Sequence, residues 1–146
     1  VQTTEGNVVH YGFIEAFIEK LGEKYNIQEI AFDRWGAVQM VQNLEGIGFT
    51  VVPFGQGFKD MSPPTKELMK LTLEEKLAHG GHPVLCWMMD NIFIRTDPAG
   101  NIKADKAKST EKIDGAVATI MALDRAIRCG NSNSASVYDD RGILFI

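Results

Sequence analysis

Two aspartates stand among apolar residues, and their positions suit metal chemistry. Asp33 directly follows the apolar run 30–32, which predicts a strand that ends at this acid. Asp114 lies on a predicted helix with Val117 and Met121 three and seven residues later, so it shares the apolar stripe of that helix. Ligands bind at the carboxyl edge of open α/β sheets, and hard divalent cations prefer oxygen ligands. The two acids therefore predict a carboxylate site for Mg²⁺ or Mn²⁺, which is one way to support phosphodiester hydrolysis.

Each acid also has an ordinary structural explanation. Asp33 could cap the following helix, although a capping box would place Glu or Gln where Gly36 stands. Asp114 could form an ion pair with a nearby Lys or Arg, because an unpaired buried carboxylate is costly. The residues alone leave these alternatives open.

A basic stretch comes just before the second acid. It contains Lys103, Lys106, Lys108 and Lys112, against Asp105 and Glu111. Lysines in such a loop can hold a phosphate backbone without reading base sequence. Taken alone, the stretch favours an ordinary solvated cluster.

Helical and strand-like segments alternate along the chain, which predicts an α/β layer. The predicted helices cover residues 11–25, 35–47, 65–78, 83–91 and 110–128. The predicted strands cover 27–32 and 49–53, a loop covers 54–64, and a hairpin covers 92–103.

Composition narrows the class of protein. The 146 residues are 45% hydrophobic and 23% charged, which is typical of one globular domain. The net charge of -4 means that a nucleic-acid partner would have to meet a local basic face. No apolar run approaches the ~20 residues that span a bilayer, so we expect no membrane segment. The two cysteines form no close pair, which favours neither a zinc site nor a disulfide framework.

Several motifs in register resemble one known family. They are Asp33-Arg34-Trp35, Phe54-Gly55-Gln56-Gly57-Phe58-Lys59, residues 61–68, His79-Gly80-Gly81-His82-Pro83-Val84-Leu85, residues 97–103, Asp105-Lys106, Lys108-Ser109-Thr110 and Ile113-Asp114-Gly115. Their order and spacing are similar to the C-terminal nuclease domain of the bacteriophage terminase large subunit. The resemblance covers about residues 5–126.

The resemblance implies an α/β fold of the RNase H-like (RuvC/integrase) type and a metal-dependent endonuclease that cuts concatemeric double-stranded DNA during packaging. In that family three acids hold two Mg or Mn ions. Asp33 and Asp114 match the second and third acids, and Asp105 falls where it would support the metal site. If the chain binds DNA, we expect phosphate contacts from Lys106 and Lys108 first, with Lys103 and Arg34 on the same face.

The first family acid lies on an opening strand, and only about nine residues precede the first predicted helix here. We therefore expect a truncated nuclease domain over residues 1–130, with a mobile tail over 131–146 and weak or absent cleavage by the isolated chain. Without the opening strand, the strand at 27–32 would present an unpaired edge. That edge predicts self-association, or its occupation by an end of the chain such as residues 142–146.

The alternative function is a catalytically incomplete remnant that grips DNA or docks on the portal or the small terminase subunit. No phosphate-binding loop of an ATPase occurs in the sequence, so the motor domain would be a separate partner. The resemblance also implies action in the cytoplasm of a bacterial host.

Overall fold

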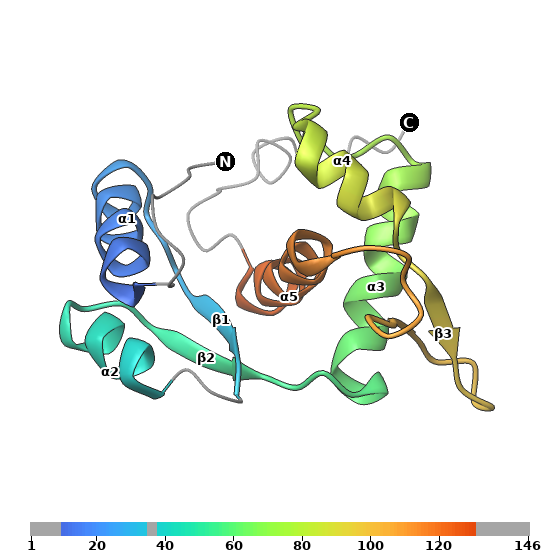
Figure 1. Cartoon of the computed structure of the whole chain (residues 1–146), viewed down its shortest axis with the longest axis horizontal. Coiled ribbons are helices and arrows are strands. Elements are labelled where there is room, and N and C mark those ends of the chain that lie inside the picture. Colours follow the sequence, from blue (N-terminus) through green and yellow to red (C-terminus); the bar gives the residue numbers. More distant parts are fainter. Residues whose placement is uncertain (1–9, 35–37, 131–146) are drawn as a thin grey trace, which may run out of the picture.

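The computed structural model describes residues 10–34 and 38–130. Within them the chain forms two neighbouring halves, joined by a short segment after the second strand (Figure 1). The first half contains α1 (Tyr11–Lys24), β1 (Ile30–Asp33), α2 (Val38–Gly46) and β2 (Val51–Phe54). The second half contains α3 (Phe58–Leu73), α4 (Pro83–Asp90), β3 (Ile94–Thr96), β4 (Ile102–Ala104) and α5 (Asp114–Cys129). The alternation of helices and strands confirms the predicted α/β class.

β1 and β2 form a parallel pair, connected through α2. Their register runs from Ile30 opposite Val51 to Asp33 opposite Phe54. The strand predicted at 27–32 begins three residues later, because the amide of Ile27 bonds to the carbonyl of Tyr25 instead of a neighbouring strand. Both strands end at the same edge, as parallel strands must.

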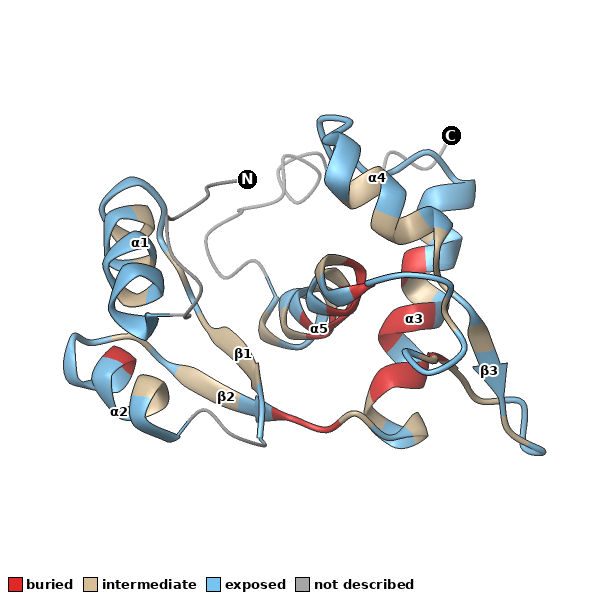
Figure 2. Cartoon of the chain, in the orientation of Figure 1, coloured by how far each residue is buried: buried red, intermediate tan, exposed pale blue. Residues whose placement is uncertain are grey.

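The core lies in the second half, between α3, α5 and β4 (Figure 2). Met61, Ile113, Ala116 and Ile120 are at most 2% exposed. α1 contributes no buried residue, although the sequence predicts an amphipathic helix there. Its apolar stripe therefore does not reach the core of the described chain.

α3 corrects the loop predicted at 54–64. The helix begins at Phe58 and includes both Pro63 and Pro64. Proline inside a helix removes a backbone hydrogen bond and costs about 3 kcal/mol, which is why the sequence favoured a loop. Here Pro64 is buried, and the hydroxyl of Ser62 accepts a hydrogen bond from the amide of Ile102 at 3.1 Å. Tertiary packing against β4 therefore overrides the local preference.

α3 also ends earlier than the predicted helix at 65–78. Glu75 adopts a positive φ of 55°, and the amide of Lys76 donates to the carbonyl of Leu71 at 2.9 Å. A residue in the left-handed conformation, followed by an amide that donates to the carbonyl five residues before it, is a typical helix C-terminus. The residue in that position is usually glycine, so the sequence gave no signal for it.

The segments before α5 also differ from prediction. The hairpin at 92–103 and the helix at 83–91 are confirmed as β3–β4 and α4. The helix predicted at 110–128 instead begins at Asp114. At its predicted start, the hydroxyls of Ser109 and Thr110 bond instead to the carbonyl of Asp105 and the side chain of Asn91.

In the described part of the chain, no helix combines the length and the apolar character needed to cross a membrane. The start of the second predicted helix and the tail predicted at 131–146 lie outside the described residues.

Replacing Glu75 with glycine is expected to stabilise the protein by about 1 kcal/mol, because glycine adopts the left-handed conformation without steric cost. Glycine at Met69, an exposed position inside α3, should instead destabilise by about 1 kcal/mol. Urea unfolding of both variants measures the difference. A loss of stability in Glu75→Gly would contradict the assigned helix stop.

Candidate metal and nucleic-acid site

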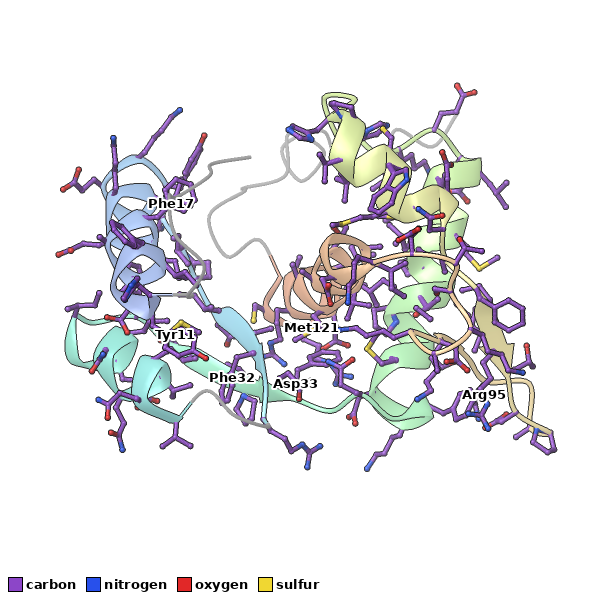
Figure 3. All side chains as sticks on the ribbon, viewed as in Figure 1. Tyr11, Phe17, Phe32, Asp33, Arg95 and Met121 are labelled. Carbon is purple, nitrogen blue, oxygen red and sulfur yellow. The ribbon has the colours of Figure 1, made fainter. Side chains whose placement is uncertain are left out.

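Asp33 ends β1 and is exposed at the carboxyl edge of the parallel pair. In Figure 3 it projects from the end of β1 on the side where Met121 of α5 lies. Just past the end of β2, Gly55 is buried beneath two side chains from different elements. A Cβ at this position would overlap the carboxylate of Asp60 and lie 2.7 Å from Nη2 of Arg34. A side chain at this position would displace the ends of Arg34 and Asp60, which converge over Gly55.

The orientation of α5 decides where Asp114 lies. Arg125 Nε donates to Glu29 Oε2 at 2.6 Å, which holds the C-terminal half of α5 beside the start of β1. Met121 Sδ accepts a hydrogen bond at 3.4 Å from Gln56, which comes just after β2. α5 therefore begins near the carboxyl ends of the strands and runs back toward their starts. Asp114 is seven residues before Met121, about 10 Å along the axis, and so lies on the carboxyl side of the sheet.

Asp114 is exposed, and its predicted burial on the apolar stripe is wrong. Its side chain is 64% exposed, and Oδ1 accepts a hydrogen bond from Lys106 Nζ at 2.7 Å. This contact lowers the pKa of the Asp114 carboxyl, with a smaller contribution from the charge of Lys112. The ion pair that the sequence left as an alternative is therefore present, and it keeps a negative charge at the start of α5.

The buried acid of α5 is Asp124, which sequence analysis missed. It is 5% exposed, and Oδ2 accepts a hydrogen bond from Nε of Arg128 at 2.7 Å. Asp124 lies seven residues after Val117 and three after Met121, so the periodicity argument that was applied to Asp114 applies to it.

Asp105 organises its own loop. Its Oδ1 accepts from the amide of Ala107 at 3.0 Å, and its carbonyl accepts from the hydroxyl of Ser109 at 2.8 Å. Oδ2 lies 3.9 Å from Arg95 Nη1. These contacts give Asp105 a structural role, and its predicted part in the metal site gains no support from them.

The donor chemistry of this edge suits a hard divalent cation. Asp33 and Asp114 supply exposed carboxylate oxygens, and Mg²⁺ is often held by one or two carboxylates together with water and phosphate. Within residues 10–34 and 38–130, no group of three or more acids, histidines or cysteines is arranged to hold a metal. The three-acid set implied by the family resemblance is thus not assembled by the described residues alone.

The predicted DNA-binding cations are held in different ways. Lys106 is paired with Asp114, whereas Lys108 lies over the ring of Phe93, 5.4 Å from its centre. Lys103 donates to the carbonyl of Gln56 at 3.1 Å and is half-buried. Arg34 lies over Gly55 at the end of the sheet. These side chains come from the loop before α5 and from the strand edge.

Arg95 is a further cation that sequence analysis missed. Its guanidinium lies 6.0 Å from the centre of the Phe58 ring, over which Lys103 also lies at 5.3 Å. Arg95 is exposed on β3 (Figure 3). The hairpin pairing that brings it to Phe58 was predicted, but the shared ring was not visible in the sequence.

A cavity of about 610 Å³ lies elsewhere. It is lined mostly by apolar side chains from the end of α3, from α4 and from the connection between them, including Leu77, Leu85 and Met89. None of the predicted site residues lines it. The candidate site is therefore the open edge at Asp33, and not this cavity.

The Glu29–Arg125 pair predicts a stability change in acid. The hydrogen bond from Arg125 is the main cause that lowers the pKa of Glu29 below its ordinary value of 4.5. The contribution of this pair to stability is thus present above pH 4.5 and is lost as the pH falls through the lowered pKa. In Glu29→Gln, the free energy of unfolding should fall less on acidification than it does in the parent chain. In Glu23→Gln, on the exposed helix α1, it should fall as much as in the parent chain. Urea unfolding as a function of pH tests this, and identical profiles for Glu29→Gln and the parent chain would contradict it.

Replacing Lys106 with methionine is expected to raise the pKa of Asp114, because the hydrogen bond from Lys106 is the main cause that lowers it. The exposed pair should affect the free energy of unfolding little. Lys108→Met is the matched control and should leave the Asp114 titration in place. Carboxyl ¹³C shifts followed by NMR through the acid range give the pKa. An unchanged value in Lys106→Met would show that the contact does not persist in solution.

Comparison with known proteins connects this geometry to a family. A family model described as "Terminase large subunit, endonuclease domain" matches residues 1–129. The chain is 41% identical over 128 residues to the large terminase subunit of Enterobacteria phage HK97, covering 86% of this chain and 25% of that protein. It is 31% identical over 126 residues to protein YmfN of Escherichia coli K12, covering 85% and 28%. The chain thus spans about a quarter of the length of these relatives.

Comparison with solved structures leads to the same family. The crystal structure of the HK97 bacteriophage large terminase matches with a TM-score of 0.77 at 41% identity, over 86% of this chain and 26% of that one. The large terminase nuclease of the thermophilic phage G20c matches with a TM-score of 0.60 at 16% identity, over 83% and 64%, which supports the fold alone. The predicted RNase H-like fold is confirmed by these neighbours. From its sequence and its fold together, the chain belongs to the family of terminase large-subunit endonuclease domains.

Proposed function

We propose that this domain cuts concatemeric double-stranded DNA during phage genome packaging, in a reaction that depends on a divalent metal. The observation that carries the proposal is the antiparallel run of α5 along β1, fixed by the Glu29–Arg125 pair. That run brings the start of α5 to the same edge of the sheet at which β1 ends. This run supports a site to which Asp33 and Asp114, which are both exposed, would contribute carboxylates.

Mg or Mn is the proposed metal, and the carboxylates of Asp33 and Asp114 are its proposed ligands. Nuclease domains of this family are generally metal-dependent. A bound divalent ion would supply charge stabilisation at phosphate and an activated water. Asp114 remains ionised at neutral pH, because Lys106 lowers its pKa. Since Lys106 also occupies one oxygen of that carboxylate, this contact must open or rearrange when Asp114 binds a metal.

The proposed DNA contacts are phosphate contacts from cations around the site. Lys106 is exposed and paired with Asp114, and Lys108 is exposed over the ring of Phe93 in the same loop. Arg34 is exposed and follows Asp33 in the sequence. Lys103 is the weakest of the four candidates, because it is half-buried and bonded to the carbonyl of Gln56. Such contacts position the duplex without reading its sequence, and they compensate locally for the net charge of -4.

The partners follow from the same proposal. They are double-stranded DNA, the ATPase domain, the portal and the small terminase subunit, acting in the cytoplasm of the bacterial host. Self-association through residues 27–32 is a further proposal that rests on the open edge of β1. The competing idea, a module that only grips DNA or docks on other subunits, is less favoured, because the family match is to an endonuclease domain.

Loss of either carboxylate is expected to remove metal binding. Asp33→Asn and Asp114→Asn should each weaken Mn²⁺ binding by at least about tenfold, since each removes one charged ligand. Asp90→Asn, at the exposed end of α4, is the matched control and should bind as the parent chain does. Electron paramagnetic resonance titration with Mn²⁺ measures the affinity. A plasmid-nicking assay in Mn²⁺ and in EDTA then reports cleavage, which we expect to be weak and to disappear with either Asn variant. Parent-like binding and cleavage in both Asn variants would refute the assignment.

Removing two phosphate contacts is expected to reduce the salt dependence of DNA binding. In Lys106→Ala/Lys108→Ala, the slope of log K against log salt should fall by about 1.8, at roughly 0.9 per contact. Lys76→Ala, which breaks an exposed pair with Glu74 at the end of α3, should leave the slope unchanged. Fluorescence anisotropy with a labelled duplex at several salt concentrations measures it. An equal effect of the two variants would argue against a localised DNA surface.

A further inference from the structure

The first turn of α5, which carries Asp114, has no side-chain cap of its own. The amides at the start of a helix have no partner inside it, and a Ser, Thr, Asp or Asn at the N-cap normally accepts a hydrogen bond from one of them. The N-cap of α5 is Ile113, whose apolar side chain is 2% exposed and makes no such bond. The amides that follow Ile113 therefore depend on water or on another element of the fold.

The sulfur of Met88 takes the place of the missing cap. The amide of Gly115, the second residue of α5, donates to Met88 Sδ at 3.1 Å. This is one of the two amides that an ordinary N-cap side chain binds. Met88 belongs to α4 and lies 27 residues earlier in the chain. Because a thioether is a weaker acceptor than a hydroxyl or a carboxylate, the contact requires a close approach of the two helices.

The absence of a side chain at Gly115 permits that close approach. A Cβ there would lie 2.7 Å from Met88 Sδ and 3.6 Å from Leu85 Cδ1. Leu85 and Met88 are three residues apart, so they lie on one face of α4, and that face meets the start of α5. A side chain at Gly115 would therefore displace the sulfur from the amide. Helix propensity disfavours glycine, so its presence here indicates a packing constraint.

α4 gives this contact a firm support. Met88 is half-buried and packs against the core. At the end of α4, Asn91 Oδ1 accepts a hydrogen bond from the hydroxyl of Thr110 at 2.7 Å, and Asn91 Nδ2 donates to the carbonyl of Trp87 at 2.8 Å. α4 thus holds both the loop that precedes α5 and the first turn of α5.

We propose that Met88 is a positioning residue for the metal site: its sulfur fixes the first turn of α5, and with it the backbone from which the Asp114 carboxylate projects. The inference deepens the proposed function and rests on it. The side chain of Asp114 is exposed and bonds to Lys106, and that bond must open when a metal binds. The backbone next to Gly115 is then what keeps the carboxylate in place. Groups that orient a metal ligand without touching the metal typically change the affinity by about tenfold or more.

The alternative is that Met88 only fills space between α4 and α5. Leucine would then replace it with little effect, because the two side chains have similar volumes. The two explanations differ in whether the shape of the side chain or its hydrogen-bond acceptor matters. Met89→Leu is the matched control, since Met89 is also half-buried on α4 and its sulfur accepts no hydrogen bond from the described residues.

Amide exchange followed by NMR tests the hydrogen bond without any metal. In Met88→Leu, the amide of Gly115 should exchange about fivefold faster than in the parent chain, because leucine offers no acceptor. Met89→Leu should leave the exchange at Gly115 unchanged. Unchanged protection of residues 94–104 shows that each variant is folded. Equal exchange at Gly115 in Met88→Leu and in the parent chain would overturn the proposal.

Mn²⁺ binding, measured by electron paramagnetic resonance, tests the positioning role. Met88→Leu should weaken the binding by about fivefold, which is less than the loss expected for Asp114→Asn, because the carboxylate remains. Met89→Leu should bind as the parent chain does. Met88→Gln, whose amide oxygen can accept the bond, should recover an affinity within about twofold of the parent. Parent-like affinity in Met88→Leu, or an affinity of Met88→Gln as low as that of Met88→Leu, would overturn the proposal.

A metal-free signal separates this inference from the proposed function. The ¹³C shift of the Asp114 carboxyl at neutral pH should change in Met88→Leu and not in Met89→Leu, because the surroundings of the carboxyl change with the first turn of α5. This result together with no Mn²⁺ binding by the parent chain would support the positioning role of Met88 and refute the proposed metal site. An unmoved carboxyl signal in Met88→Leu would overturn the positioning role even if the parent chain binds Mn²⁺.

Discussion

The ion pair between Glu29 and Arg125 is the contact on which the geometry of the candidate site depends. It joins residues 96 positions apart, at 2.6 Å, with both side chains less than a quarter exposed. The hydrogen bond lowers the pKa of Glu29 and raises that of Arg125, so both partners stay charged across the physiological range. The pair ties the end of α5 to the start of β1. Because a helix is rigid, fixing one end also fixes where the other end, with Asp114, can lie.

Packing in the second half of the chain also holds α5 in position. α5 buries Ala116, Val117 and Ile120 in the core that it shares with α3. α3 keeps its shape in spite of two prolines, because its buried face and the Ser62 hydroxyl are held by β4. The first half of the chain has far less burial, since α1 contributes no buried residue and α2 only Leu44. The candidate site thus lies between a well-packed half and a loosely packed one.

Much of this arrangement was predictable from local sequence. The apolar run that ends in Asp33, the Asp97–Gly100 turn and the helix after Pro83 all combine a pattern with a clear stop signal, and the structure contains each of them. The errors occurred where tertiary contacts override local preference. Pro63 and Pro64 are helical because they are packed, and Glu75 ends α3 without glycine.

For the candidate site, too, the sequence indicated what depends on local pattern and not what depends on tertiary contacts. The candidate acids could be selected from the sequence, because acids at strand and helix ends are visible there. The burial of each acid could not, since it depends on where α5 begins and on which side packs against α3. Asp124 is buried and Asp114 is exposed, although the helical periodicity places both acids on the apolar stripe. Contacts such as the shared ring of Phe58, or Asp60 and Arg34 over Gly55, join segments whose distance only the fold defines.

The central claim is that Asp33 and Asp114 hold the same divalent ion. Crystals of this chain soaked in Mn²⁺, with anomalous scattering recorded near the manganese edge, test it most directly. The account predicts an anomalous peak with carboxylate oxygens of both residues about 2.1–2.2 Å away and the ammonium of Lys106 displaced from Asp114. Manganese bound at other residues, with the Lys106–Asp114 contact intact and Asp33 remote from it, would contradict the account.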